Sequence, residues 1–275
     1  MLLTEWYSIG SLGVLNVFLT SIFLVSVSAA KPTETITIAA GEWPPFISEQ
    51  LKENGIAGHI VKEALSRSNV RVQFVFLPWV RSFEATKRGK YVASISWAPT
   101  VARKKDFVFS DPISYHSKVF FHLKELDFNW DKVSDLKPYR IASTDGYTYG
   151  EEFDQLIGNT DYKIEVVPGD VQRIKMLFGQ RIDLAPIDYD VGLFLVRKLF
   201  GQKGIDQVSY SKKPIMKTPM SVMFSKTYDQ KEVSRLIGLL NKGLESMRAK
   251  GRIDQMFWNL RKGWYSEVDA QKGAH

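Results

Sequence analysis

The sequence predicts an α/β fold in which mostly parallel sheets are flanked by helices. Short apolar runs with a period of two alternate with amphipathic runs of helical period along most of the chain. No short internal repeat and no low-complexity linker interrupts this alternation. The composition, 44% hydrophobic and 24% charged over 275 residues, is close to that of an average globular chain. These observations exclude a disordered chain, a fibrous repeat and a multi-span membrane protein.

The first half of the chain predicts a β-α-β-α-β unit. Residues 70–76 (VRVQFVF) alternate between apolar and polar side chains, as a half-buried strand does. Gly41 ends the first strand-like run, and Gly89 closes the short helical run before it. We expect the following elements in order: strand 35–40, helix 59–67, strand 70–76, helix 82–88 and strand 91–97.

A second α/β unit is predicted after residue 138, followed by a helical tail. The tail helix carries apolar residues at helical spacing and is closed by Gly251. A hinge must join the two units. We expect strands at 139–143, 162–167, 182–187 and 221–224, a turn at 145–146, and helices from about 148, at 169–179, at 191–200 and at 229–250.

The N-terminus is predicted to be a secretory signal peptide over residues 1–30. Residues 12–30 hold no charged side chain and end in Val27-Ser28-Ala29-Ala30, small residues of the kind that signal peptidase accepts. The alternative is an uncleaved anchor, since the apolar stretch is just long enough to cross a bilayer. Either interpretation places the rest of the chain outside the cytoplasm, in the periplasm.

Composition excludes several kinds of chemistry. The chain has no cysteine, which rules out disulfides, thiolate metal sites and cysteine nucleophiles. Its four histidines are scattered and none stands at metal-ligand spacing from another, so neither a metal site nor a cofactor is expected. The formal charge of +7 comes from basic residues spread along the chain, which does not favour nucleic acid as a partner.

Several motifs in order resemble the family 3 extracellular solute-binding proteins, the polar amino-acid receptors of ABC importers. They are Glu42-Trp43-Pro44-Pro45-Phe46 after the first strand, Gly58 to Ala64, Pro78-Trp79-Val80-Arg81, Lys87-Arg88-Gly89-Lys90, the run from Thr100 to Pro112, Asp135-Leu136-Lys137, Gly146-Tyr147-Thr148-Tyr149-Gly150, and Gly179-Gln180-Arg181-Ile182-Asp183. The resemblance covers about residues 34–260.

The resemblance implies a two-lobed periplasmic-binding-protein clamshell of type II, each lobe a mostly parallel sheet flanked by helices. Lobe one would comprise residues 31–113 and 214–275, and lobe two residues 114–213, with hinge strands near 114–120 and 209–218. The ligand would lie between the lobes, and closure would bury it. The resemblance also implies a monomer whose partner is an ABC permease in the inner membrane.

The chemistry of an amino-acid ligand requires a fixed cation and a fixed anion. Arg103 stands where the resembled receptors place their carboxylate-binding arginine, three residues after Thr100. Asp188 stands where they place the amine-binding aspartate, although an N-cap for the following helix is an alternative that can coexist. Thr148, in the turn that opens a helix, is a candidate for holding a carboxylate or for a plain N-cap.

The remaining candidate ligand-binding residues come from lobe one. Trp43, Trp79 and Trp97 could form an aromatic wall, although packing in the core is the alternative for the last two. Arg81 could contact a ligand side chain or be a solvated helix start. Ser96 and Ala98 stand where many receptors have a glycine and a hydroxyl residue, which leaves the ligand's side chain open. Glu42 completes the set.

Two classes of function follow. The favoured one is a non-enzymatic receptor that binds a small polar zwitterion, an amino acid being the first candidate, and delivers it to a permease. The alternative is an enzyme, because cyclohexadienyl dehydratases share the resembled fold; Glu42 is then the candidate general acid, without an obvious partner. A free-standing ligand sensor would use the same binding chemistry as the receptor.

Overall fold

The structure, a computed structural model, describes residues 34–144 and 147–265. The predicted signal peptide and the predicted turn at 145–146 lie outside the described residues. Within the described ranges, no helix is both long enough and apolar enough to cross a membrane.

Ten strands and eight α-helices are present in the described part of the chain. The strands are β1 (Glu34–Ala40), β2 (Val70–Phe76), β3 (Ala93–Trp97), β4 (Phe107–Phe109), β5 (Ser114–Leu123), β6 (Arg140–Thr144), β7 (Lys163–Val167), β8 (Ala185–Asp188), β9 (Val208–Tyr210) and β10 (Met216–Ser225). The α-helices are α1 (Gly55–Ser66), α2 (Trp79–Lys87), α3 (Val101–Lys104), α4 (Glu151–Asp154), α5 (Asp170–Phe178), α6 (Tyr189–Gln207), α7 (Gln230–Ala249) and α8 (Arg252–Arg261). Short 3-10 turns lie at Lys52–Asn54 and Val133–Leu136.

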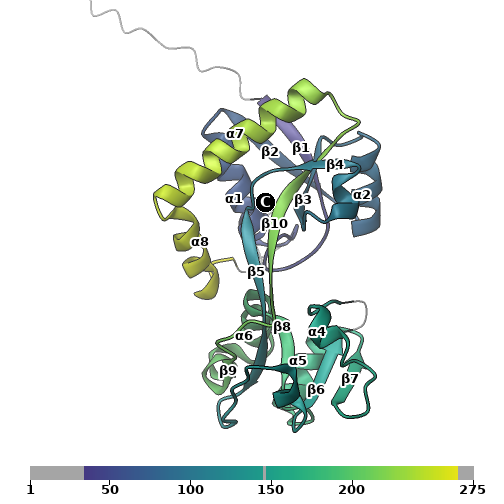
Figure 1. Ribbon diagram of the computed structural model, residues 1–275. Helices are drawn as coiled ribbons and strands as arrows, with labels where there is room; N and C mark the ends of the chain where they lie inside the picture. The colour runs from purple at the N-terminus through teal and green to yellow at the C-terminus, as the bar shows by residue number, and fades with distance from the viewer. Residues whose placement is uncertain (1–33, 145–146, 266–275) are drawn as a thin grey trace, which may run out of the picture. The chain divides into compact units, whose positions relative to one another are not determined.

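The strands β5 and β10 join two sets of elements into one hydrogen-bonded sheet. Its order is β2-β1-β3-β10-β5-β8. β1 pairs in parallel with β2 and β3, whereas β10 is antiparallel to both β3 and β5. Figure 1 shows β5 and β10 side by side where they link the β1–β3 set to the elements around β8.

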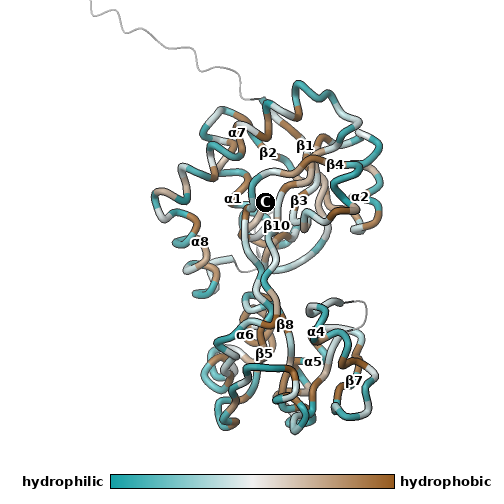
Figure 2. Tube along the Cα trace, viewed as in Figure 1, coloured by the Kyte–Doolittle hydropathy of each residue, from teal (hydrophilic) through white to brown (hydrophobic). Residues whose placement is uncertain are grey.

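Helices α1 and α7 cover the sheet of the first set. The buried face of α1 carries Ile56, Ile60 and Val61, and α7 turns Leu236 and Leu240 inward. Figure 2 shows hydrophilic and hydrophobic residues alternating along α7, as expected for a helix with one buried face. The two helices approach closely at Gly243, where an added Cβ would lie 2.3 Å from the Ala64 carbonyl oxygen.

The second set contains the parallel pair β6-β7 and the strand β8. A bridge between Ile141 and Leu184 brings β8 beside β6. Phe120 on β5 is buried among aromatic side chains of this set, with ring centroids 5.3 Å from Trp130 and 5.7 Å from Phe153. The strand that joins the two sets is therefore also part of the core of the second.

A strand is present at each predicted position, and β2 begins and ends at the predicted residues. Helix α1 begins at Gly55, earlier than the predicted residue 59, and α2 begins at Trp79 directly after Pro78. The helix predicted from about residue 148 is limited to Glu151–Asp154. Helix α6 runs past the predicted end at residue 200, with a break at Gly201, where φ is 64°.

Candidate functional site

The loop after β1 fixes the positions of two tryptophans. The Trp43 amide donates to the Ile47 carbonyl at 2.7 Å, which closes a turn and leaves the Trp43 ring half-buried. The Trp79 indole donates from Nε1 to the Glu42 carbonyl at 3.2 Å. Gly41 makes room for this indole, because a Cβ at that position would lie 2.3 Å from the ring. The Glu42 side chain itself is exposed and accepts the Glu49 amide.

Trp97 continues the aromatic surface at the end of β3. Its Nε1 donates to Ser94 Oγ at 2.8 Å, which fixes the plane of the ring. The rings of Trp97 and Trp79 meet edge to face, with centroids 5.2 Å apart and planes at 89°. Both tryptophans are half-buried, so each contributes to packing and presents an edge to its surroundings.

Arg103 is held against this surface by three contacts. Thr100 caps α3 and accepts the Arg103 amide at 3.3 Å. The guanidinium donates from Nη1 to the Ala98 carbonyl at 3.0 Å, and its Cζ lies 4.7 Å from the centroid of the Trp97 ring. Among the described residues no carboxylate pairs with it, although partial burial lowers the pKa of Arg103. A half-buried, oriented guanidinium with free donors can bind a carboxylate.

Two further lobe-one candidates differ in their surroundings. Ser96 is buried with φ at 65°, a left-handed conformation that is strained for a residue other than glycine. Its Oγ has no hydrogen-bond partner among the described residues. Arg81 is exposed in the first turn of α2, which agrees with the alternative prediction of a solvated residue at the start of a helix.

One face of β5 contacts both the loop after β1 and the loop after β6. Because side chains alternate along a strand, Ser114, His116 and Lys118 share this face. The His116 ring lies 3.8 Å from the Phe46 ring and 4.7 Å from the Trp43 ring, so it packs on the loop after β1. Lys118 Nζ donates to the Thr148 carbonyl, in the loop after β6.

The Thr148 loop is organised by Asp154. The Thr148 hydroxyl donates to the Asp154 carboxylate, which also accepts the Tyr149 amide at 2.8 Å. The residue at the N-cap of α4 is Gly150, so the plain N-cap interpretation of Thr148 is wrong. Thr148 is exposed, and its carbonyl faces Lys118.

Asp188 is the N-cap of α6. Its Oδ1 accepts the amides of Asp190 and Val191 at 3.1 and 3.2 Å, which confirms the capping alternative. Its other oxygen, Oδ2, lies 3.6 Å from His116 Nδ1, and neither atom has a hydrogen-bond partner in the described part of the chain.

Asp188 and His116 are both neutral near pH 6 by our assignment. A separation of 3.6 Å would suit an ion pair, but the two side chains are only 7% and 5% exposed. Burial raises the pKa of Asp188 to about 7 and lowers the pKa of His116 to about 3. We take the neutral pair because desolvation of both groups outweighs the attraction at this distance.

Sequence reasoning missed His116 and Lys118. Both lie on a strand that was predicted, and their period-two spacing with Ser114 was a usable signal. Their importance depends on what the strand pairs with, because Lys118 stands directly opposite Asp188 in the ladder between β5 and β8. His116 and Lys118 on β5 lie among the other candidate site residues. We call the whole set the β5 face; it comprises Trp43, Trp79, Trp97, Arg103, His116, Lys118, Thr148 and Asp188.

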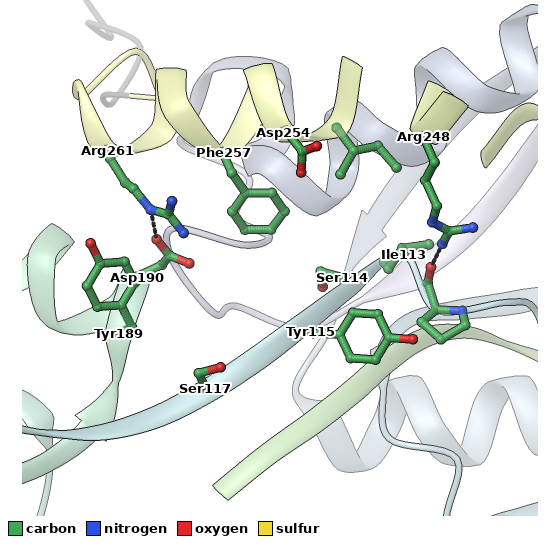
Figure 3. Close-up of a pocket in the computed structure, with 12 residues that line it drawn as sticks. Ile113, Ser114, Tyr115, Ser117, Tyr189, Asp190, Arg248, Asp254, Phe257 and Arg261 are labelled. Atoms are coloured by element: carbon green, nitrogen blue, oxygen red, sulfur yellow. Dashed lines mark hydrogen bonds and ion pairs between the residues drawn. The ribbon is translucent and has the colours of Figure 1, made fainter. Parts of the chain in front are cut away.

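A second groove lies beside β5, lined by Tyr115 and Ser117, which alternate with His116 and Lys118, and also by Ser114. Figure 3 shows Tyr115 and Ser117 lining it, with the dashed ion pair between Arg261 and Asp190 at its end, 3.0 Å long. Its volume is about 520 Å³. No predicted site residue lines it. No group of three or more metal-binding side chains is arranged around an ion site in residues 34–144 and 147–265.

The topology and the site define a ligand-binding α/β protein of the type II periplasmic-binding class. The sequence pattern of the bacterial extracellular solute-binding proteins, family 3, matches residues 36–264. The chain belongs to this family, so the predicted resemblance and fold class are confirmed. No curated protein sequence matches the chain.

Solved structures show the same fold at low sequence identity. An ancestral cationic amino acid solute-binding protein (AncCDT-1) is 22% identical, with a TM-score of 0.65 over 84% of this chain and 96% of that one. Substrate-binding domain 2 of Lactococcus lactis GlnP, in an open conformation, is 18% identical, with a TM-score of 0.66 over 82% and 95%. An arginine transport-system periplasmic binding protein from Legionella pneumophila is 20% identical, with a TM-score of 0.59 over 82% and 99%.

Proposed function

We propose that the protein is a periplasmic receptor that binds a small polar solute carrying a carboxylate, an amino acid or a close relative, and delivers it to an ABC-type permease. Arg103 carries this proposal. Its guanidinium is half-buried, oriented by Ala98 and Trp97, and unpaired among the described residues. A cation kept in this state gains from a ligand carboxylate, since a charge-assisted pair forms where water is partly excluded.

The proposed lobes are residues 31–113 with 214–275, and residues 114–213. The course of β5 and β10 supports these limits, because β10 pairs with β3 of the first set, β5 pairs with β8 of the second, and the two strands pair with each other. The ligand would lie on the β5 face, between the loop after β1 and the loop after β6. Closure about the two strands would bury it.

The remaining predicted residues are proposed as ligand contacts around Arg103. Trp43, Trp79 and Trp97 would pack on the ligand's apolar part, and the unpartnered hydroxyl of Ser96 would take one hydrogen bond. Ala98, Arg81, Glu42 and Thr148 are proposed at the periphery, and Asp188 as a partner for a ligand ammonium. A soluble monomer exported by the signal peptide completes the proposal.

A binding role is proposed in preference to catalysis. The solved relatives named above are called binding proteins or domains. Glu42, the candidate general acid, is exposed and accepts one backbone amide. A general acid of a dehydratase would need a sheltered position beside its substrate. Turnover of prephenate or arogenate by the purified protein, lost in Glu42→Gln, would contradict the binding role.

The test is calorimetry with residues 31–275 against amino acids and their deaminated analogues. Arg103→Ala should weaken binding of every ligand by about 30-fold or more, because losing a charge-assisted contact costs about 2 kcal/mol. Arg88→Ala is the matched control, since Arg88 is an exposed arginine of the same lobe. Equal affinities of Arg103→Ala and the unaltered protein would refute the proposal.

A further inference from the structure

Lys118 is a half-buried cation with unused hydrogen-bonding capacity. Its ammonium donates to the Thr148 carbonyl and lies 4.8 and 5.4 Å from the ring centroids of Tyr149 and Tyr147. No carboxylate of the described residues lies within ion-pair distance of it, which leaves two of its three N–H donors without a protein partner there. The aromatic rings orient the charge without neutralising it.

The acidic groups nearest to Lys118 are already engaged. Asp188 caps α6 through Oδ1, and its Oδ2 faces His116 Nδ1 at 3.6 Å. Asp154 accepts the Thr148 hydroxyl and the Tyr149 amide. Asp170 pairs with the fully buried Arg173, which also donates to the Tyr149 hydroxyl. Asp170 is therefore engaged by Arg173, whose Cζ lies 5.7 Å from the centroid of the Tyr149 ring.

Lys118 disfavours a positively charged side chain on the ligand. Lys118 and Asp188 stand directly opposite each other on β5 and β8, so their side chains share one face. A cationic ligand side chain placed beside Lys118 would be repelled by its ammonium. Burial lowers the pKa of Lys118, and the charges of nearby acidic groups, Asp188 first, offset this lowering only in part.

Lys118 and Arg103 belong to one continuous surface. Arg103 stacks on Trp97, Trp97 contacts Trp79, and Trp79 is bonded to the backbone next to Trp43. The Trp43 ring then contacts His116, which precedes Lys118 on the same face of β5. One series of aromatic contacts thus connects two half-buried cations that have no carboxylate partner among the described residues.

We propose that the ligand carries two acidic groups, one bound by Arg103 and the other by Lys118, and that Lys118 selects small dicarboxylates, with or without an α-amino group. This inference rests on the proposed receptor function and narrows its ligand class. It separates this chain from a receptor for basic amino acids, in which a lysine beside the ligand would be unfavourable.

The experiment compares glutamate, glutarate, glutamine and arginine by calorimetry, with the unaltered protein and Lys118→Met. The substitution keeps the length of the side chain and removes its charge. The matched control is Lys213→Met, because Lys213 also donates to a backbone carbonyl, that of Asp131, and lies 4.7 Å from an aromatic centroid, that of Trp130.

The unaltered protein should bind glutamate or glutarate about tenfold or more tightly than glutamine and arginine. Lys118→Met should lose about tenfold for the diacids and change glutamine little, while Lys213→Met changes neither. Preference for glutamine or arginine, or an equal loss for all ligands in Lys118→Met, would overturn the inference and leave the receptor function standing if binding still depends on Arg103. Absence of binding by these four probes and by every other amino acid would overturn both proposals.

Discussion

Asp188 and His116 form a buried pair that holds the same number of protons in the folded and the unfolded chain. Replacing either residue should therefore make the free energy of unfolding depend on pH through the residue that remains. In the unfolded chain at pH 5 to 6 the pair holds one proton, on the histidine, because the ordinary pKa values are 3.8 and 6.5. In the folded chain the pair also holds one proton, on Asp188, because its pKa is about 7 and that of His116 is about 3. The stability contribution of the pair is therefore independent of pH between about 4 and 6.5.

Each single substitution removes one side of this balance. In Asp188→Asn, which retains a good N-cap, only the unfolded histidine binds a proton, so the free energy of unfolding should rise with pH by about 1.4 kcal/mol per unit. In His116→Gln only the folded aspartic acid binds a proton, so the free energy of unfolding should fall with pH by about the same amount. Asp190, which raises the pKa of Asp188, and Lys118, which lowers the pKa of both residues, remain in all variants.

The assay is urea unfolding of ligand-free protein at several pH values between about 4 and 6.5, the range set by the ordinary pKa values. The slopes of the two single variants, relative to the unaltered protein, should have opposite signs. The double variant Asp188→Asn/His116→Gln should restore the unaltered protein's slope, which controls for losses of packing. Parallel slopes for the unaltered protein and both single variants would refute the assignment of a neutral pair.

Three substitutions at small residues test other parts of the structure. Gly243→Ala should destabilise the protein by about 1–3 kcal/mol in thermal unfolding, because its Cβ would lie 2.3 Å from the Ala64 carbonyl oxygen. Gly238→Ala in the same helix has nothing within 4 Å of its Cβ and should stabilise the protein by about 0.5–1 kcal/mol; destabilisation of the same size as in Gly243→Ala would contradict the close-approach argument. Ser96→Gly should stabilise the ligand-free protein by about 1 kcal/mol, because it relieves the positive φ and removes an unpartnered buried hydroxyl. The same variant should bind ligand more weakly in calorimetry, and unchanged affinity would remove Ser96 from the proposed site.

The elements that could be predicted from the sequence are those with local causes. Strand β2 was located within its limits because its alternation is complete over 70–76. The start of α1 at Gly55 was missed because residues 55–58 are mostly small and give no amphipathic period. Strand β10 was predicted as two separate runs because Pro219 interrupts the pattern. In the structure Pro219 is the next-to-last residue of β10 that pairs with β5, and pairing with β3 begins two residues later at Ser221, so its missing N–H falls close to a change of partner.

The candidate site divides in the same way. Arg103 and its Thr100 cap are close in sequence, and a motif was enough to find them. Asp188 was found at the end of a strand, in a position where its capping role is local. The neutral pairing of Asp188 with His116 was not predictable, because it depends on the register of β5 against β8 and on burial by the loop after β1. For the same reason the sequence did not single out Lys118.

Buried polar side-chain atoms without a hydrogen-bond partner are concentrated around the β5 face. Native proteins satisfy most such atoms, and each exception costs about 1–3 kcal/mol. In the described part of the chain the exceptions are Ser96 Oγ, Ser221 Oγ, His116 Nδ1, Asp188 Oδ2 and Arg173 Nε. Ser221 stands opposite Trp97 in the ladder, and Arg173 is bonded to the tyrosine beneath Lys118. His116 and Asp188 thus belong to the β5 face, Ser96 and Ser221 are neighbours of Trp97 along the chain and across the ladder, and Arg173 contacts the Tyr149 ring beside Lys118. These costs in stability fall near Arg103 and Lys118, which have no carboxylate partner among the described residues. Unsatisfied polar atoms and unpaired cations are expected together at a site that a ligand completes.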